Sequence, residues 1–513
     1  MSGKFNKFRQ VLGTMDRRTV LGRGAAVVGG LLAGQFLTSG KAEAQARGAT
    51  PVNSDKSLTQ NTFTVSIAGE TLAVRPFSMQ TEPEFMNLVK LIRESDLSVA
   101  HLEMNFGTDQ EIKWTPRGTA GGASYMMADP QIAKDLRWMG FHALSLAHNH
   151  SFDWGPEGIM ATIKHTKEAG MGYAGTGPDL ETARAPGYFE VDKGRIGMVS
   201  IGSGNNLYEW AGYGKGNIPG RPGMNPLRVS TRYEVPHAAA EQLKAVAKNL
   251  GVMSDAAAAR KEFNISPGAA GAGTGTASFA WVDGDKYNIT SFAHPKDVEA
   301  NLRSVAEARA MSDFVLVEHH NSTSEGGRSQ DPSEFVVDFA RKTIDTGADL
   351  YVGHGWHTFL GIEIYKGKPI ILGTGNFIFQ TGFQTRIPAD QFESYGYDMD
   401  KLVTLNKTMG TSQMHPGGGN EDWCWTALFQ FKYVNRKLTE IILHPVEMGM
   451  DFSSGKGVPY RKVGDWKWPY IDGSPRLAYG ANGAAILKRL QDRCALRGTK
   501  MEIAGGVGVI KVA

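Results

Sequence analysis

The sequence has few cysteines, and this excludes one class of site. Among its 513 residues only Cys424 and Cys494 are cysteines. Their separation excludes a CxxC zinc or redox motif. The pattern leaves open whether the two cysteines form a disulfide or remain thiols, because the redox compartment decides between these states.

The sequence also lacks an excess of positive charge outside its N-terminus. The whole chain carries a net charge of +3, but residues 1–46 hold seven basic and two acidic residues, a net charge of +5. The rest of the chain therefore carries a net charge of −2. Because this bulk charge is close to neutral, we expect no nucleic-acid partner.

Two catalytic signatures are missing as well. The sequence has no Gly-x-Ser-x-Gly elbow of a serine hydrolase, and Gly202-Ser203-Gly204 is a poor substitute for it. The glycine-rich segment 268–275 lacks the Lys-Ser/Thr ending of a phosphate-binding loop. We interpret this segment as a flexible loop.

The N-terminus has the features of an export signal. A basic lead precedes Arg17-Arg18, an apolar Gly/Ala-rich run spans residues 25–37, and small residues at 42–46 offer a cleavage site. The paired arginines resemble a twin-arginine signal. We therefore expect residues 1–46 to be a signal peptide, the twin-arginine export machinery to be a partner, and the product to be periplasmic or secreted.

An N-terminal membrane anchor is the alternative interpretation of this segment. The apolar run is short and diluted by glycine, whereas a transmembrane helix needs about 20 apolar residues. No later segment is apolar enough to span a membrane. We therefore expect no stable membrane span after cleavage.

The chain after residue 61 alternates between strand and helix patterns. Strands are expected at 63–68, 97–102, 142–147, 314–317 and 350–352, and helices at 82–95, 130–139, 156–170, 297–311 and 332–346. Two hairpins are expected at 359–372 and 425–444. Alternation of this kind predicts βαβ units, an α/β fold and a mixed or parallel sheet.

The same pattern suggests how the domains are organised. We expect a linker at 47–61 and one domain at 62–460, interrupted by loop-rich insertions at about 203–295 and 381–422. The first insertion has one expected helix, 237–250, and resembles a lid. Residues 461–513 are expected to form a C-terminal extension that packs on the domain, with a helix at 480–497.

Polar side chains directly follow many of the expected strands. In the segment 144–155 a strand leads at once to Asn149, His150 and Asp153 and then to a helix. Carboxyl ends of strands in open α/β sheets are where reactive groups gather, which predicts one shared site. The other residues at strand ends are Glu70, Glu103, His319, His320, His354, His357 and Asn376.

Carboxylates, imidazoles and carboxamides are ligands of first-row divalent metals. We expect one or two ions of Mn, Fe or Zn, and two ions about 4 Å apart would polarise a substrate oxygen and supply hydroxide near neutral pH. Any single histidine can instead be an ordinary hydrogen-bonded residue, which is our expectation for His148 and His444. The adjacent His319 and His320 must point to opposite faces of their strand.

Five motifs together resemble the CapA family, which is named for poly-γ-glutamate capsule synthesis. The segment 147–155 is similar to the family's Ala-Asn-Asn-His-x-x-Asp-x-Gly, and 101–103 is similar to its Asn-Leu-Glu. The segments 313–320, 352–357 and 375–377 resemble its remaining motifs, which end in His-Trp-Gly, Gly-His-His-Pro-His and Gly-Asn-Phe. The resemblance covers about residues 63–444, with a similar tail helix.

The resemblance implies a metallophosphatase-like αββα sandwich, two sheets with helices outside. It also implies catalytic roles for His150 and Asp153, with His150 as the proton donor or transition-state stabiliser. The implied metal ligands are Glu70, Glu103, Asn149, His320, His354 and His357. Three departures leave the number of metals open: Glu70 replaces aspartate, Gly355 replaces histidine, and Asn321-Ser322 replaces Trp-Gly.

A proline-stiffened loop in the first insertion suggests how a substrate is bound. Arg221 and Arg228 flank Asn225, and the forked guanidinium groups of arginines suit carboxylates or phosphates. Aromatic residues at 208, 210 and 213 could wall a pocket. We therefore predict an anionic small-molecule or polymer substrate and these substrate-binding residues: Arg221, Asn225, Arg228, His319 and Asn376. The alternative is a solvated basic loop.

Three functions are consistent with the sequence. The first is an exported metal-dependent hydrolase that cleaves an amide, γ-glutamyl or phosphoester bond of an anionic substrate through metal-activated water. The second is a non-catalytic or accessory protein in poly-γ-glutamate capsule synthesis. The third is a periplasmic binding protein for a small anion, which would need no metal.

Overall fold

The structure is a computed structural model. It describes residues 62–116, 125–203, 207–249, 281–321, 323, 331–381, 384, 386–389, 421–451, 458–459 and 473–512. The expected signal peptide and linker, 1–61, lie outside the described residues, as does most of the second insertion, 381–422. The predictions for these segments therefore remain predictions.

Ten strands form the larger sheet, in the order β25-β26-β21-β20-β1-β2-β5-β6, with β19 beside β1 and β24 beside β21. The β1–β2 and β2–β5 pairs are parallel, whereas β20 runs antiparallel to β1. The strands are β1 (Thr62–Leu72), β2 (Leu97–Leu102), β5 (Ala143–Ser145), β6 (Gly172–Ala174), β19 (Asn376–Phe379), β20 (Trp425–Val434), β21 (Lys437–Glu447), β24 (Arg476–Leu477), β25 (Glu502–Ala504) and β26 (Val507–Lys511).

Seven strands form the second sheet, in the order β11-β9-β15-β16-β18-β17, with β8 beside β9. Its centre, β9-β15-β16-β18, is parallel, and β17 closes the sheet as the predicted antiparallel hairpin. The strands are β8 (Gly187–Val191), β9 (Gly194–Ser203), β11 (Pro226–Leu227), β15 (Phe314–His320), β16 (Leu350–His354), β17 (Phe359–Tyr365) and β18 (Lys368–Thr374).

The two sheets pack against each other through aromatic side chains. The ring of Phe63 on β1 lies 5.4 Å from that of Phe314 on β15, and the rings of Phe359 on β17 and Phe429 on β20 are also 5.4 Å apart. One hydrophobic core contains buried residues of both sheets. Burial of this shared apolar face holds the strand ends of the two sheets together.

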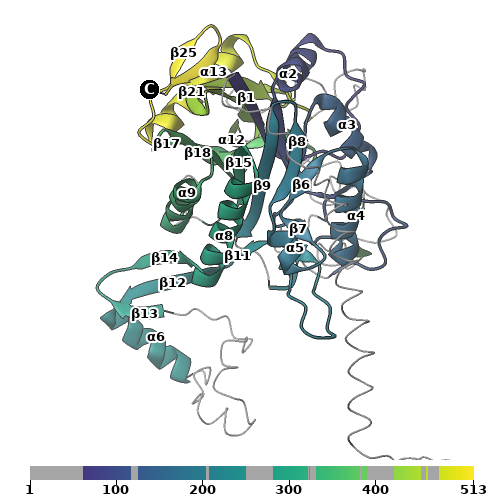
Figure 1. Cartoon of the computed structure of the whole chain (residues 1–513). Coiled ribbons are helices and arrows are strands. Elements are labelled where there is room, and N and C mark those ends of the chain that lie inside the picture. Colours follow the sequence, from purple (N-terminus) through teal and green to yellow (C-terminus); the bar gives the residue numbers. More distant parts are fainter. Residues whose placement is uncertain are drawn as a thin grey trace, which may run out of the picture. The chain divides into compact units, whose positions relative to one another are not determined.

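Helices cover the strands on two sides (Figure 1). α8 (Pro295–Met311) and α9 (Glu334–Thr346) pack on the second sheet, where Val305 and Phe339 join the core with Val315 and Val317. α2 (Pro83–Arg93) and α3 (Gln131–Met139) bury their apolar faces in the core that contains the larger sheet. The α/β class is confirmed, and the layers agree with the metallophosphatase-like sandwich.

The helices predicted at 156–170, 237–250 and 480–497 also form close to those ranges, and three short helices were not predicted. α4 (Gly155–Glu168) has proline in its first turn, where the missing N–H costs no hydrogen bond. α13 (Gly480–Ala495) packs on β17 and β21, and β26 joins the larger sheet. The other helices are α5 (Leu180–Arg184), the 3₁₀ helix η1 (Leu207–Glu209), α6 (His237–Asn249) and α12 (Glu421–Cys424). Within the described residues, no helix has the length and apolar character of a membrane span.

The first insertion contains more strand than the sequence pattern predicted. Besides the expected helix, α6, it forms a three-stranded sheet in the order β13-β12-β14. Its strands are β12 (Val229–Pro236), β13 (Trp281–Gly284) and β14 (Asn288–Ala293). β12 has mostly exposed or half-buried side chains, so it lacks the buried alternation that marks a strand in sequence. The shorter strands elsewhere are β3 (Asn105–Phe106), β4 (Met127–Ala128), β7 (Thr176–Gly177), β10 (Gly223–Met224), β22 (Met450–Asp451) and β23 (Val458–Pro459).

Cys424 and Cys494 are both buried thiols, not a disulfide. Burial raises the pKa of each thiol to about 12. The structure therefore decides between the two states that the sequence left open.

Candidate metal centre

Strand ends from both sheets meet in one buried polar region. β2 of the larger sheet contributes His101 and then Glu103, and β15 of the second sheet contributes Glu318 and His320. The His101 Nε2 and His320 Nδ1 atoms share a hydrogen bond of 2.9 Å across the two sheets. The prediction that polar strand ends gather at one place agrees with this arrangement.

Glu70, Glu103 and His357 form a first cluster. Their possible ligand atoms all lie within 4.8 Å of one another. Both glutamates are fully buried, whereas the His357 side chain is 20% exposed. The Nδ1 atom of His357 contacts Glu70 Oε2 and lies 3.8 Å from Glu103 Oε2. This cluster therefore combines two carboxylates with one imidazole that reaches solvent.

The backbone around Glu70 aims its carboxylate into the cluster. The pairing of β1 with β2 shifts its register between Ala68 and Glu70, as in a bulge, which redirects a side chain. Gly69 is required there, since a Cβ atom on it would lie 1.9 Å from Gly375 O. Gly375 O also accepts a hydrogen bond of 2.9 Å from Glu70 N.

The loop that follows β16 completes the first cluster. Gly355 has φ +108°, and its N–H donates a hydrogen bond of 2.5 Å to Glu70 Oε1. His357 itself has φ +56°, an uncommon conformation for a residue other than glycine. The loop therefore positions one ligand, His357, and orients another, Glu70.

The electrostatics of the first cluster favour positive charge between the carboxylates. Burial alone lowers the pKa of His357, but Glu70 and Glu103 outweigh it and raise the pKa to about 10. Burial alone raises the pKa of Glu70, but His357 lowers it to about 2. Burial and the charge of Glu70 raise the pKa of Glu103 to about 7 against the opposing effect of His357.

Both carboxylate oxygens of Glu103 in the first cluster suit a cation. Glu103 Oε1 and Glu103 Oε2 are buried and have no hydrogen-bond partner within the described part of the chain, whereas Glu70 Oε2 contacts His357 Nδ1. A buried acceptor without a donor costs roughly 1–3 kcal/mol. A divalent cation would compensate these oxygens, so the residues present suit the predicted metal.

His101, Glu318 and His354 form a second cluster. Their possible ligand atoms also lie within 4.8 Å of one another, and all three side chains are at most 1% exposed. His354 Nε2 makes a short contact with Glu318 Oε2. The predicted ligand His354 therefore lies with residues that the sequence analysis did not select, and the predicted ligand His320 lies beside it, bonded to His101.

The segment after β5 brings the predicted proton donor to the same region. His150 Nδ1 lies 2.8 Å from Asp153 Oδ2, which also accepts a hydrogen bond of 2.9 Å from Met126 N. Burial lowers the pKa of His150, but Asp153 and Glu103 outweigh it and raise the pKa above its usual value. The interaction with Glu103 links His150 to the first cluster.

Asn149 lies between two residues that reach the clusters. His148 packs its ring edge-on against His101, 5.5 Å away, and accepts a hydrogen bond of 3.1 Å from His150 N through Nδ1. Asn149 Oδ1 is buried and has no hydrogen-bond partner among the described residues. This oxygen is therefore available to a cation or a substrate.

Two predicted substrate residues have other partners in the structure. Asn376 Oδ1 lies 2.7 Å from His357 Nδ1, and its Nδ2 donates to Trp423 O, so Asn376 orients a cluster residue. His319 lies on the opposite face of β15 from His320, as the alternation predicted. Its ring contacts Ser203 Oγ at 2.7 Å and the Tyr351 hydroxyl at 2.6 Å.

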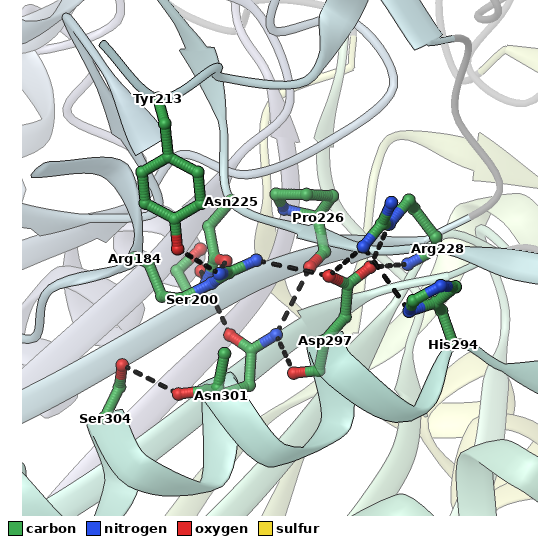
Figure 2. A network of polar contacts seen from close by, with 11 residues as sticks. Arg184, Ser200, Tyr213, Asn225, Pro226, Arg228, His294, Asp297, Asn301 and Ser304 are labelled. Carbon is green, nitrogen blue, oxygen red and sulfur yellow. Dashed lines mark hydrogen bonds and ion pairs between the residues drawn. The ribbon is translucent and has the colours of Figure 1, made fainter. Parts of the chain in front are cut away.

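Figure 2 shows that the predicted arginine loop belongs to an internal polar network. Arg228 donates to both oxygens of Asp297, which is 2% exposed, at 2.6 and 2.8 Å. Asn225 is fully buried and donates to Ser200 O and Asn301 Oδ1. Arg221 is exposed and donates to Trp210 O at 3.0 Å. The structure therefore gives Arg228 and Asn225 internal partners and leaves the Arg221 guanidinium at the surface.

His101 and Glu318 carry a signal that the sequence analysis could have used. Glu318 is two residues before His320, so both side chains take the same face of β15. His101 is two residues before Glu103, at the end of a strand whose neighbours also end in ligands. Period-two alternation therefore identifies them, provided that the inward face of each strand is known.

The chain was compared with known proteins. It matches the family model described as "Bacterial capsule synthesis protein PGA_cap" over residues 31–381. It is 30% identical over 461 residues to "Uncharacterized protein y4sH" of Sinorhizobium fredii (strain NBRC 101917 / NGR234), covering 88% of this chain and 93% of that protein.

Two further relatives carry names that refer to the capsule or its polymer. "PGA biosynthesis protein CapA" of Bacillus subtilis (strain 168) is 35% identical over 89 residues, 17% of this chain and 23% of that protein. "Capsule biosynthesis protein CapA" of Bacillus anthracis is 22% identical over 259 residues, 50% of this chain and 45% of that protein. The similarity to these two relatives is thus confined to part of each chain.

Proposed function

The chain belongs to the bacterial capsule synthesis family, CapA, and we propose that it acts in capsule polymer metabolism as an exported, metal-dependent hydrolase of an anionic substrate. The observation that carries this proposal is the first cluster. There, two buried carboxylates face an imidazole, and both oxygens of Glu103 have no hydrogen-bond partner within the described residues. Such a donor set binds Mn, Fe or Zn.

Each residue of the first cluster has a distinct role in this proposal. Glu70 and Glu103 would hold the cation, with Asn149 as a further oxygen ligand. Asn376 would fix the orientation of His357 through the hydrogen bond between Asn376 Oδ1 and His357 Nδ1. A bound divalent ion would supply Lewis-acid activation of water and of the substrate oxygen. The 20% exposure of His357 leaves this side of the cluster open to a substrate.

His150 is the proposed proton donor to the leaving group. Asp153 holds the Nδ1 atom of His150 and favours the imidazolium form, so Nε2 is the nitrogen that can donate. A donor whose pKa is raised toward the working pH suits general acid catalysis. Asp153 is in turn fixed by Met126 N, so the pair enters the reaction already oriented.

The substrate is proposed to be anionic because the family is named for capsule synthesis and its CapA relatives for poly-γ-glutamate or the capsule. Amide, γ-glutamyl and phosphoester bonds all fit attack by activated water. Of the predicted substrate-binding residues, Arg221 presents an exposed guanidinium, and we propose it as the contact to a substrate carboxylate or phosphate.

Metal content of the mature protein tests the proposal first. The protein is purified after export without chelators or a histidine tag and measured by elemental mass spectrometry. We expect bound Mn, Fe or Zn, with at least one equivalent lost in Glu103→Gln and in His357→Ala. The matched control is Glu447→Gln, which changes a buried glutamate bonded to Arg476 and Asn482 and should keep the metal.

Hydrolysis of γ-glutamyl peptides and phosphoesters by the metal-loaded protein is then assayed. Turnover that is lost in Glu103→Gln and retained in Glu447→Gln supports the hydrolase. The absence of bound metal, together with no rise in melting temperature on adding Mn, Fe or Zn, would overturn the metal-dependent mechanism.

A non-catalytic accessory role is the second candidate. It is favoured by the names of the CapA relatives, which state biosynthesis and not hydrolysis. This role predicts that the metal-loaded protein binds poly-γ-glutamate without cleaving it. Polymer binding by calorimetry, combined with no turnover, would replace the hydrolase proposal by this one.

A further inference from the structure

A single peptide unit, between Tyr125 and Met126, supports the pair formed by His150 and Asp153. The N–H of Met126 donates a hydrogen bond of 2.9 Å to Asp153 Oδ2, the same oxygen that lies 2.8 Å from His150 Nδ1. The other oxygen, Asp153 Oδ1, is buried and has no hydrogen-bond partner among the described residues. The peptide N–H therefore selects the carboxylate oxygen that holds the imidazole, because without it either oxygen could turn toward His150.

The carbonyl of the same peptide unit is held by two donors. Tyr125 O accepts a hydrogen bond of 3.0 Å from Trp154 Nε1 and a second, short one from Gln384 Nε2. Trp154 is 6% exposed and Gln384 is 2% exposed, so both bonds are shielded from water. A peptide unit is planar, and its N–H and C=O point in opposite directions in the usual trans form. Fixing the carbonyl therefore also fixes the direction of the Met126 N–H.

The backbone at Tyr125 has a conformation that needs support. Tyr125 has φ +46°, in the left-handed region that residues other than glycine seldom adopt. Its ring is fully buried and lies 5.9 Å from the ring of Trp154, and its hydroxyl donates a hydrogen bond of 2.8 Å to Pro116 O. Backbone strain of this kind gathers at functional sites, where the surrounding structure must hold it. The strain at Tyr125 thus points to a functional reason for the orientation of this peptide.

Gln384 comes from a distant part of the chain. Trp154 directly follows Asp153, so one short segment contacts both ends of the peptide, with the carboxylate at the N–H and the indole at the C=O. Gln384 is instead 259 positions from Tyr125 and lies near the start of the second insertion, 381–422. The orientation of the peptide therefore depends on tertiary packing as well as on its local segment.

We propose that Gln384 is a positioning residue, which holds Asp153, and thereby the imidazole of His150, through the peptide between Tyr125 and Met126. This inference rests on the proposed function, in which His150 donates a proton to the leaving group. Gln384 touches no reacting atom in that reaction. Its loss should therefore lower the rate of the chemical step and leave substrate binding unchanged.

Kinetics of Gln384→Met test the effect on the reaction. This substitution removes the donor and keeps the length of the side chain. With the γ-glutamyl peptide or phosphoester that the metal-loaded wild type hydrolyses, we expect kcat to fall by about 10-fold and KM to stay unchanged. The fall is smaller than the roughly 10²–10⁴-fold that general acid catalysis contributes, because Trp154 still holds the carbonyl. The matched control is Gln491→Met, which removes a hydrogen bond of 2.9 Å from Gln491 Nε2 to Met501 O and should keep both constants.

Nuclear magnetic resonance of the Met126 amide tests the positioning without any turnover. The protein is prepared with isotopically labelled methionine, and the Met126 signal is assigned by its loss in Met126→Leu. We expect Gln384→Met to move this amide proton signal upfield, in the same direction as Asp153→Asn, because a weaker hold on the carbonyl weakens the hydrogen bond to Asp153. Gln491→Met should leave the signal at its wild-type position.

A second variant keeps the test decisive if Gln384→Met fails to fold. Trp154→Phe removes the other donor to Tyr125 O, so it should also move the Met126 signal upfield and lower kcat. Two results would overturn the inference. One is a Met126 signal at the wild-type position in both variants, and the other is a signal that moves while kcat keeps its wild-type value. Absent turnover in the wild type would instead count against the hydrolase proposal, and the Met126 signal alone would then decide whether Gln384 positions Asp153.

Discussion

Gly355→Ala is predicted to damage both the stability of the protein and its metal centre. Gly355 has φ +108°, and a Cβ atom added there would lie 2.7 Å from the backbone carbon and oxygen of Asn321. Contacts between carbon atoms normally occur at about 3.5–4.0 Å, so the loop or β15 must shift. Such a movement would displace Gly355 N and weaken its hydrogen bond to Glu70 Oε1.

The magnitude follows from two costs. A positive φ angle costs alanine roughly 1–2 kcal/mol, and an overlap that moves the backbone costs roughly 1–3 kcal/mol more. The free energy of unfolding should therefore fall by about 2–5 kcal/mol. At roughly 2 °C per kcal/mol for a large domain, the melting temperature should fall by about 4–10 °C.

Gly367→Ala is the matched control for this substitution. Gly367 has φ +76° in the β17–β18 hairpin, and a Cβ atom added there would meet nothing within 4 Å. This variant keeps the cost of the positive φ angle and lacks the overlap, so its melting temperature should fall by roughly 2–4 °C. Its metal content should equal that of the wild type.

Differential scanning calorimetry and elemental mass spectrometry measure the two effects. We expect Gly355→Ala to melt several degrees below Gly367→Ala and to lose metal from the first cluster. Equal melting temperatures of the two variants, with the full metal content in both, would refute the view that Gly355 is needed for the close approach to Asn321 and for orienting Glu70.

Three other measurements test local electrostatics. Glu111→Gln should lower the melting temperature at neutral pH, because hydrogen bonds from Lys164 and His165 outweigh burial and lower the pKa of Glu111 to about 2. This stabilisation is full above pH 4.5 and is lost as the pH falls toward 2, so the difference in melting temperature from the wild type should shrink over that range. A difference that calorimetry finds unchanged with pH would contradict this prediction. Asp153→Asn should lower the pKa of His150, which Asp153 raises; histidine NMR titration measures this, and an unshifted pKa would mean that Asp153 is not its cause. Asp297→Asn should lower the free energy of unfolding by about 2 kcal/mol, since it weakens charge-assisted hydrogen bonds with Arg228. A melting temperature within 1 °C of the wild type would mean that the network in Figure 2 contributes little to the stability of the protein.

The candidate site shows how far alternation along a strand can be used for prediction. The adjacent histidines of β15 were predicted to point to opposite faces, and His320 indeed reaches His101 while His319 packs on Phe339. The same rule places Glu318 beside His320. It was missed because alternation alone does not tell which face of a strand turns inward.

The arginine loop shows a different limit. Its sequence, with two arginines near an asparagine, is typical of an anion-binding loop, but Asp297 at the start of α8 neutralises Arg228 and Asn301 holds Asn225. These partners are 69 and 76 residues away in the chain. No local pattern could predict them, because an ion pair depends on how the loop packs against the helix.

The sequence by itself determined the order of the main strands and helices outside the first insertion, the α/β class and the gathering of polar groups at strand ends, because hydrophobic periodicity and turn residues are local properties. Only the tertiary structure decided how those groups are divided. It separates Glu70, Glu103 and His357 from His101, Glu318 and His354. The physical reason is that the aromatic packing of the two sheets sets which strand ends face each other, and this packing joins residues more than 200 positions apart.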